Sequence, residues 1–155
     1  MFTHEMYVQG VVEAAKAMIC QRIKLAETQP NNSELLAVEK AKLDKINAVK
    51  IVYGIGHQAG LRGVTYYGKW NKPNCETPVD LVEVCAFGQQ NWTQVAGTTI
   101  HELAHVVAGY GAAHGPEWKK ACEQLGLRKP RATNHNYHMS GFDPFIRNKL
   151  VALPK

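Results

Sequence analysis

The sequence lacks the cysteine pairs of a zinc ribbon or of a disulfide framework. Its four cysteines are widely scattered and form no C-x-x-C motif. A small secreted scaffold would carry a denser cysteine pattern. We therefore expect reduced cysteines in a cytoplasmic protein. They are Cys20, Cys75, Cys85 and Cys122.

Long apolar runs are also missing. No segment approaches the roughly eighteen uninterrupted apolar residues of a transmembrane helix, because charged residues interrupt even the helical N-terminal region. Residues 1–10 lack the basic start and the apolar stretch of a signal peptide. These absences exclude membrane-spanning classes and predict a protein without a membrane partner.

The chain has 155 residues, of which 45% are hydrophobic and 20% charged, as is ordinary for one globular domain with its own core. Its net charge of +5 is unevenly placed, because residues 115–155 hold eight Lys or Arg against three acidic residues. This basic quarter suits a polyanion such as DNA, although solubility alone also explains it. The candidate DNA contacts are Lys119, Lys120, Arg128, Lys129 and Arg131.

Hydrophobic periodicity predicts two N-terminal helices. The first spans about Thr3 to Glu27, and the second begins after Ser33, a suitable N-cap, and runs into the high forties. Runs rich in β-branched and aromatic residues then predict a small, mainly antiparallel sheet of about three strands. The predicted strands are Val49–Tyr53, Gly63–Trp70 and Leu81–Phe87.

Two further helices are predicted after the sheet. One runs from about Thr93 to Ala108, and the other begins near Pro116 and ends at Gly126. The remaining tail is expected to pack on the domain as coil, with a short helix at Pro144–Leu150. We therefore expect a single α+β domain over residues 1–155. It comprises a helical part (1–48), a sheet and active-site core (49–127) and a basic tail (128–155).

The string His101-Glu102-Leu103-Ala104-His105 carries the chemistry. Two histidines four residues apart on a helix project from one face, so both imidazoles can reach one metal ion. Glu102 is placed to take a proton from an attacking water rather than to bind the metal. The apolar flanks predict a buried helix, in which these polar side chains would be costly without a metal. The alternative is a chance match with hydrogen-bonded core histidines.

A catalytic zinc ion usually has three protein ligands and one open position. His114 is the best third ligand, because the chain can turn back after Gly109 and bring it under the first helix. The longer H-E-x-x-H-x-x-G-x-x-H motif is not met, since Ala and Gly stand at positions 108 and 111. The other candidates are His135, His138, Glu117 and Glu123.

The H-E-x-x-H string, followed after eight residues by His114-Gly115-Pro116-Glu117-Trp118 and a basic helix, resembles the SprT-like metallopeptidases. In that family the third histidine opens an H-G-x-x-F/W motif. The resemblance covers residues 30–127 and is most specific in 99–118. It implies a zincin-like fold, with the motif helix beneath an antiparallel sheet whose edge strand receives the substrate. Some relatives degrade proteins crosslinked to DNA, and many carry a zinc ribbon, for which this sequence has no C-x-x-C pair.

These observations predict a zinc-dependent endopeptidase that acts on proteins or peptides, with DNA-associated proteins as one substrate class. Glu102 would pass the proton of the attacking water to the leaving amine. Tyr137 or His138 could donate to the oxyanion, although both lie in what is equally well a solvated polar loop.

Two competing hypotheses remain. One is a nucleic-acid-associated protein with a structural zinc site, against which Glu102 argues, because a structural site needs no acid beside its ligands. The other is a metal-dependent hydrolase of a non-peptide amide.

Overall fold

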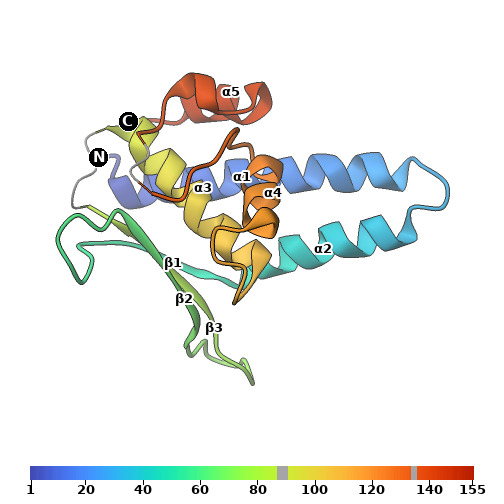
Figure 1. Ribbon diagram of the computed structural model, residues 1–155, viewed down its shortest axis with the longest axis horizontal. Coiled ribbons are helices and arrows are strands. Elements are labelled where there is room, and N and C mark those ends of the chain that lie inside the picture. The colour runs from blue at the N-terminus through green and yellow to red at the C-terminus, as the bar shows by residue number, and fades with distance from the viewer. Residues whose placement is uncertain (87–90, 134–135) are drawn as a thin grey trace.

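The computed structural model describes residues 1–86, 91–133 and 136–155. Over these residues it has five α-helices, a three-stranded sheet and one short 3-10 turn at Met139–Gly141 (Figure 1). The chain is therefore α+β, as predicted. The helices are α1 (His4–Glu27), α2 (Ser33–Ala48), α3 (Trp92–Ala108), α4 (Pro116–Gln124) and α5 (Pro144–Ala152), and the strands are β1 (Lys50–Gly54), β2 (Gly63–Trp70) and β3 (Val79–Cys85).

The predicted elements are confirmed with small shifts at their ends. Thr3 caps α1, because its hydroxyl accepts a hydrogen bond from the backbone N–H of Met6 at 3.2 Å. Asn32, rather than Ser33, takes the N-cap position of α2. β3 begins two residues earlier than predicted, because Val79 pairs with Trp70 of β2. The predicted end of that strand, Phe87, lies outside the described residues.

The sheet is mixed, so the prediction of a mainly antiparallel sheet is wrong. The strand order is β1-β3-β2, in which β1 pairs with β3 in parallel and β2 pairs with β3 in antiparallel orientation. After β1 the chain forms β2 at the opposite edge of the sheet. β3 then lies between the two and runs in the same direction as β1. Val82 and Val84 of this central strand are fully buried. β2 is left as an edge strand.

Helix α3 lies against β2 and β3 of the sheet and also packs on α1, α2 and α4 (Figure 1). It is buried along most of its length, as the apolar flanks of its histidines predict. The C-terminal tail packs back through Phe142, Ile146 and Leu150, which are fully buried. Among the described residues, no helix is long and apolar enough to cross a membrane.

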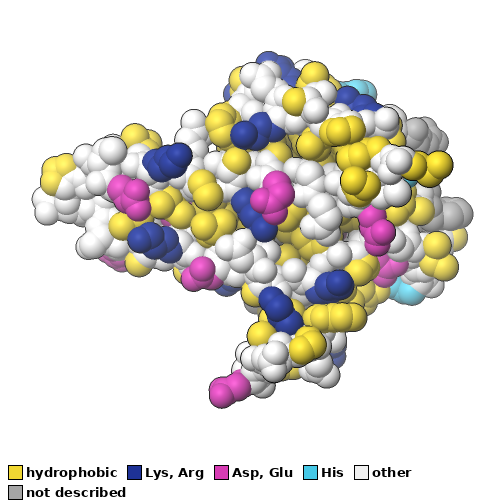
Figure 2. Space-filling model, turned by 180° about the vertical axis from the view of Figure 1, so that it is seen from behind, with side chains coloured by type: hydrophobic (Ala, Val, Ile, Leu, Met, Phe, Trp, Pro, Cys, Tyr) yellow, Lys and Arg dark blue, Asp and Glu magenta, His cyan; other side chains and the backbone are white. Residues whose placement is uncertain are grey.

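Helices α1 and α2 form a hairpin that projects from the rest of the molecule (Figure 1). Seen from behind in Figure 2, the hairpin carries basic and acidic side chains among apolar ones. Its exposed apolar side chains include Leu25, Leu35 and Val38. The charges of this part of the surface are therefore mixed in sign.

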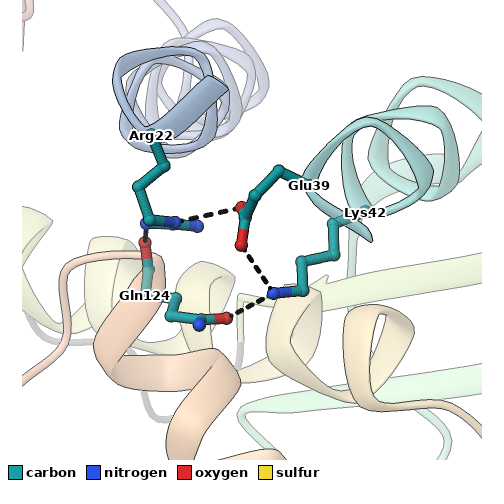
Figure 3. Close-up of polar contacts among 4 residues, drawn as sticks. All are labelled: Arg22, Glu39, Lys42 and Gln124. Carbon is teal, nitrogen blue, oxygen red and sulfur yellow. Dashed lines mark hydrogen bonds and ion pairs between the residues drawn. The ribbon is translucent and has the colours of Figure 1, made fainter. Parts of the chain in front are cut away.

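A partly buried ionic network joins this hairpin to α4 (Figure 3). The carboxylate of Glu39 accepts hydrogen bonds from Arg22 at 3.0 Å and from Lys42 at 2.8 Å. Arg22 also donates to the backbone carbonyl of Gln124, and Lys42 donates to its side chain at 2.9 Å. Because Gln124 is the last residue of α4, Arg22 satisfies a carbonyl that the helix itself leaves free.

Glu39 is only 1% exposed, so its charge depends on these partners. Burial works to raise the pKa of Glu39, but the hydrogen bond from Lys42 and the charge of Arg22 outweigh it. The pKa therefore lies below its usual value. Glu39 is consequently ionised in the folded protein at neutral pH and holds two cations between α1, α2 and α4.

Glu39→Gln is expected to lower the free energy of unfolding by about 3 kcal/mol at pH 7, because two partly buried cations lose their counter-charge. Since the folded pKa of Glu39 is below its unfolded value, this stability is present above the unfolded pKa and is lost as the pH falls through the folded pKa. The difference from the wild type should therefore shrink at acidic pH. Urea unfolding in the presence of a chelator at several pH values measures it.

Glu13→Gln is the matched control. Glu13 pairs with Lys16 at 2.8 Å, but its side chain is 68% exposed. The control should change the free energy of unfolding by less than about 0.5 kcal/mol. An equal loss in the two variants, or a loss for Glu39→Gln that does not depend on pH, would contradict the role given to the network.

Candidate metal centre

Three histidine side chains converge at one point. His101 and His105 come from successive turns of α3, and His114 comes from the loop between α3 and α4. The Nε2 atom of His114 lies 3.1 Å from the Nε2 atoms of both His101 and His105. Two nitrogen ligands of a tetrahedral zinc ion, each about 2.0–2.1 Å from the metal, lie about 3.3–3.4 Å apart. The three side chains are therefore close enough together to bind one metal ion.

The protonation state of this cluster suits a cation. Burial, and then repulsion by His114, lowers the pKa of His105 to about 4, and burial lowers the pKa of His114 below its usual value. His105 and His114 are therefore held neutral, which is the form of imidazole that binds metals. A neutral imidazole has only one N–H group with which to donate a hydrogen bond. Three ring nitrogens that meet at one point are therefore better suited to bind a cation than to hydrogen-bond to one another.

The loop that delivers His114 depends on two glycines. Gly109 ends α3 with a φ of 88°, and Gly111 follows with a φ of 90°, both in the left-handed region that favours glycine. Two turns then reverse the chain, closed by the bonds from Ala112 N–H to the Gly109 carbonyl and from Gly115 N–H to the Ala112 carbonyl. The short return predicted from the sequence is therefore present, and His114 lies just before α4.

Trp118 of α4 packs against all three histidines of the cluster. It is fully buried, and its ring centroid lies 4.7, 5.6 and 4.6 Å from those of His101, His105 and His114. Its indole N–H also donates to the carbonyl of His101 at 3.3 Å. Its contact with all three histidines follows from the packing of α4 on α3.

Glu102 lies beside the histidines but is not part of the donor cluster found among the described residues. It is 6% exposed, and its carboxylate accepts a hydrogen bond from Thr65 of β2 at 2.8 Å. Burial raises the pKa of Glu102 to about 7, with a smaller opposing effect from Thr65. A carboxyl group with a pKa near neutrality can both accept and return a proton. Thr65 has no signal in the sequence, because it lies 37 residues from its partner.

A glycine permits the close approach of β2 to this carboxyl group. A Cβ atom on Gly63 would lie only 2.8 Å from Cγ of Glu102 and 2.7 Å from a methyl group of Thr98. Any larger residue would push the strand or the carboxylate aside. The glycine at the start of β2 therefore allows the strand to lie this close to Glu102.

Two clefts meet at His101, Glu102, Gly63 and Ala132, which line both. The first has a volume of about 350 Å³ and is also lined by Arg62, Gln94, Thr98, Arg131 and Tyr137. The second has a volume of about 510 Å³ and is also lined by Val64, Thr65, Tyr67, His105, Tyr110, Gly111, Ala113 and His114. The carboxyl group and the histidines are thus reachable from two adjoining spaces.

The two candidate oxyanion donors differ in position. Tyr137 lines the first cleft, and its hydroxyl lies 3.2 Å from Nδ1 of His101. Burial raises the pKa of Tyr137 well above its usual value, so the hydroxyl stays protonated. His138 instead lines a separate cavity with Arg128, Lys129 and Arg131, because successive residues of the extended segment point in different directions.

The remaining candidates are divided. Lys119 and Lys120 are exposed on α4. They are not among the described residues that line the cavity of Arg128, Lys129 and Arg131, which we call the basic cavity. Glu117 and Glu123 are exposed on the same helix and do not join the described donor cluster. His135 lies outside the described residues.

No protein-family model, no curated protein and no solved structure matches the chain. A functional assignment therefore rests on the residues of the site itself.

His114→Ala is expected to lower the zinc affinity by more than roughly 100-fold, because it removes one of three converging nitrogens. Loss of a residue that only hydrogen-bonds to a metal ligand costs up to about that factor. His138→Ala is the control, since His138 lines a different cavity. Titration of both variants with zinc against a chromophoric chelator measures the affinity. Wild-type affinity in His114→Ala would exclude His114 as a ligand.

Proposed function

We propose that the chain is a zinc-dependent endopeptidase in which His101, His105 and His114 hold the metal and Glu102 is the general base. The observation that carries the proposal is the position of Glu102. Its buried carboxyl group lies beside a three-histidine cluster without joining it, at the junction of two clefts. A purely structural zinc site is usually closed by four ligands and needs no such acid.

Bound zinc would supply the Lewis acid that polarises the scissile carbonyl and lowers the pKa of a water molecule. Glu102 takes the proton of the attacking water and returns it to the leaving amide nitrogen. Thr65 holds the carboxylate in place for this transfer through its 2.8 Å hydrogen bond. Tyr137, whose protonated hydroxyl lines the first cleft, is the proposed donor to the oxyanion and also orients the ring of His101.

The surroundings of the site favour a polypeptide substrate. Two clefts meet at Glu102, which leaves room for substrate residues on both sides of the scissile bond. β2 is an edge strand that contacts α3, so an extended substrate chain could pair with it. This arrangement agrees with a zincin-like fold and with the SprT-like resemblance of the motif. We propose a cytoplasmic location, in keeping with four free cysteines.

Glu102→Gln should retain zinc and lose cleavage, because the amide keeps the shape of the side chain but cannot accept the proton. General-base catalysis commonly contributes about 10²- to 10⁴-fold, so activity should fall by at least that factor. Metal analysis and cleavage of an unfolded protein, both with a chelator-treated control, measure the two properties. Loss of zinc in step with activity would make Glu102 a ligand. Full activity of the variant would exclude this mechanism.

Nucleic-acid binding is favoured by one further feature, the basic cavity lined by Arg128, Lys129, Arg131 and His138, with a volume of about 720 Å³. Arg128 pairs with Asp143 at 3.5 Å. Arg131 also lines the first cleft, so a polyanion in this cavity would lie close to Glu102. We therefore propose that DNA-associated proteins are one substrate class. The alternative function, a nucleic-acid-associated protein with a structural zinc site, would retain this cavity but not the cleavage.

Lys129→Glu/Arg131→Glu is expected to abolish DNA binding at low salt, because it reverses two of the charges around the cavity. Wild-type affinity should fall steeply with salt, by close to one unit of log–log slope for each phosphate neutralised. Fluorescence anisotropy with single- and double-stranded oligonucleotides measures both effects. Lys24→Glu/Lys40→Glu makes the same charge change at exposed positions of the helical hairpin and serves as the control. Equal binding by both double variants would remove DNA from the proposal.

A further inference from the structure

Tyr67 and Tyr110 form an aromatic wall of the second cleft. Tyr67 of β2 and Tyr110 of the loop after α3 lie edge to face, with ring centroids 5.6 Å apart. Val64 and Ala113 add apolar surface to the lining of the same cleft. A large apolar surface thus directly adjoins the residues that would perform the reaction.

The charges around the two clefts differ. Arg62 and Arg131 line the first cleft. Among the described residues that line the second cleft there is no Lys or Arg, and its one carboxyl group is that of Glu102. A phosphate backbone would find no Lys or Arg here to neutralise it, and the only protein charge that a bound charged side chain could meet is that of Glu102. The second cleft therefore suits an uncharged apolar group.

The two tyrosines are held in different ways. The hydroxyl of Tyr67 donates to the carbonyl of His105 at 3.3 Å, which fixes this ring against α3. Tyr110 is 89% exposed and stands between Gly109 and Gly111, around whose α-carbons there is open space. Most of its ring therefore faces solvent, and a group bound against it would remove apolar surface from water.

From these observations we propose that the second cleft is a substrate subsite that selects a large apolar or aromatic side chain next to the scissile bond. Tyr67 is its fixed wall and Tyr110 is the wall that closes over the bound side chain. The inference rests on the proposed peptidase function and adds a substrate preference to it. Tyr110 acts here on specificity and takes no part in the proton transfer.

The test uses two fluorescent host peptides of Gly, Ala and Ser that differ at one central position, which is Phe in one and Ser in the other. The zinc-loaded wild type should cleave the Phe peptide at least about 10-fold better in kcat/KM, at a bond adjoining Phe, as expected for one well-filled apolar subsite. Mass spectrometry of the products locates the bond. Tyr110→Ala should bring the ratio of the two kcat/KM values close to one, whereas Tyr110→Phe, which retains the ring, should keep the preference.

Zinc content and thermal unfolding of the Tyr110 variants control for damage to the fold, and both should match the wild type because this side chain is highly exposed. Equal cleavage of both peptides by the wild type, or an unchanged preference in Tyr110→Ala, would overturn the inference and leave the peptidase proposal standing. If the wild type cleaves neither these peptides nor an unfolded protein, the peptidase proposal itself fails.

A measurement without turnover separates these cases further. Binding of the Phe peptide to Glu102→Gln, followed by anisotropy, should be weakened by Tyr110→Ala in the same background. A single-stranded oligonucleotide should leave the bound Phe peptide in place. Its displacement of the peptide, with a matching loss of oligonucleotide affinity in Tyr110→Ala, would assign the aromatic wall to stacking on bases and overturn the inference.

Discussion

The structure depends on one constraint, which is that its most buried helix also holds the polar side chains of the candidate metal centre. Helix α3 contacts the sheet and three other helices, yet it holds two histidines and a glutamate. Such groups are stable in the interior only if each has a partner. Thr65 provides one for Glu102, and Tyr137 provides one for His101. The remaining ring nitrogens turn toward His114, where a cation would satisfy all three.

This constraint explains the arrangement of the neighbouring elements. β2 must come close enough to reach Glu102, and the glycine at position 63 allows it. α4 must pack against the histidines, and Trp118 fills that contact. The far end of α4 is held in turn by Arg22, whose other partner is the buried Glu39. The helical hairpin thus braces the helix that follows the third histidine, which links the stability of the fold to the geometry of the site.

Local patterns were sufficient to predict the helices and the histidine cluster, because helical spacing fixes His101 and His105 and a glycine turn limits where His114 can lie. The order of the strands could not be predicted, because local patterns do not show whether β2 or β3 lies next to β1. Thr65 and Tyr67 could not be found either, because their partners lie 37 and 38 residues away. Adjacency in the sequence groups His138 with Tyr137, but the backbone turns the two side chains into different cavities.

The central claim is that the three histidines form an open zinc site next to a general base. X-ray absorption at the zinc edge of the purified, zinc-loaded protein tests it most directly, because it counts the ligands. The account predicts three imidazole nitrogens and one oxygen from solvent, each about 2.0–2.1 Å from the metal. A thiolate at about 2.3 Å, or a fourth imidazole in place of the oxygen, would mean a closed structural site and would contradict the account.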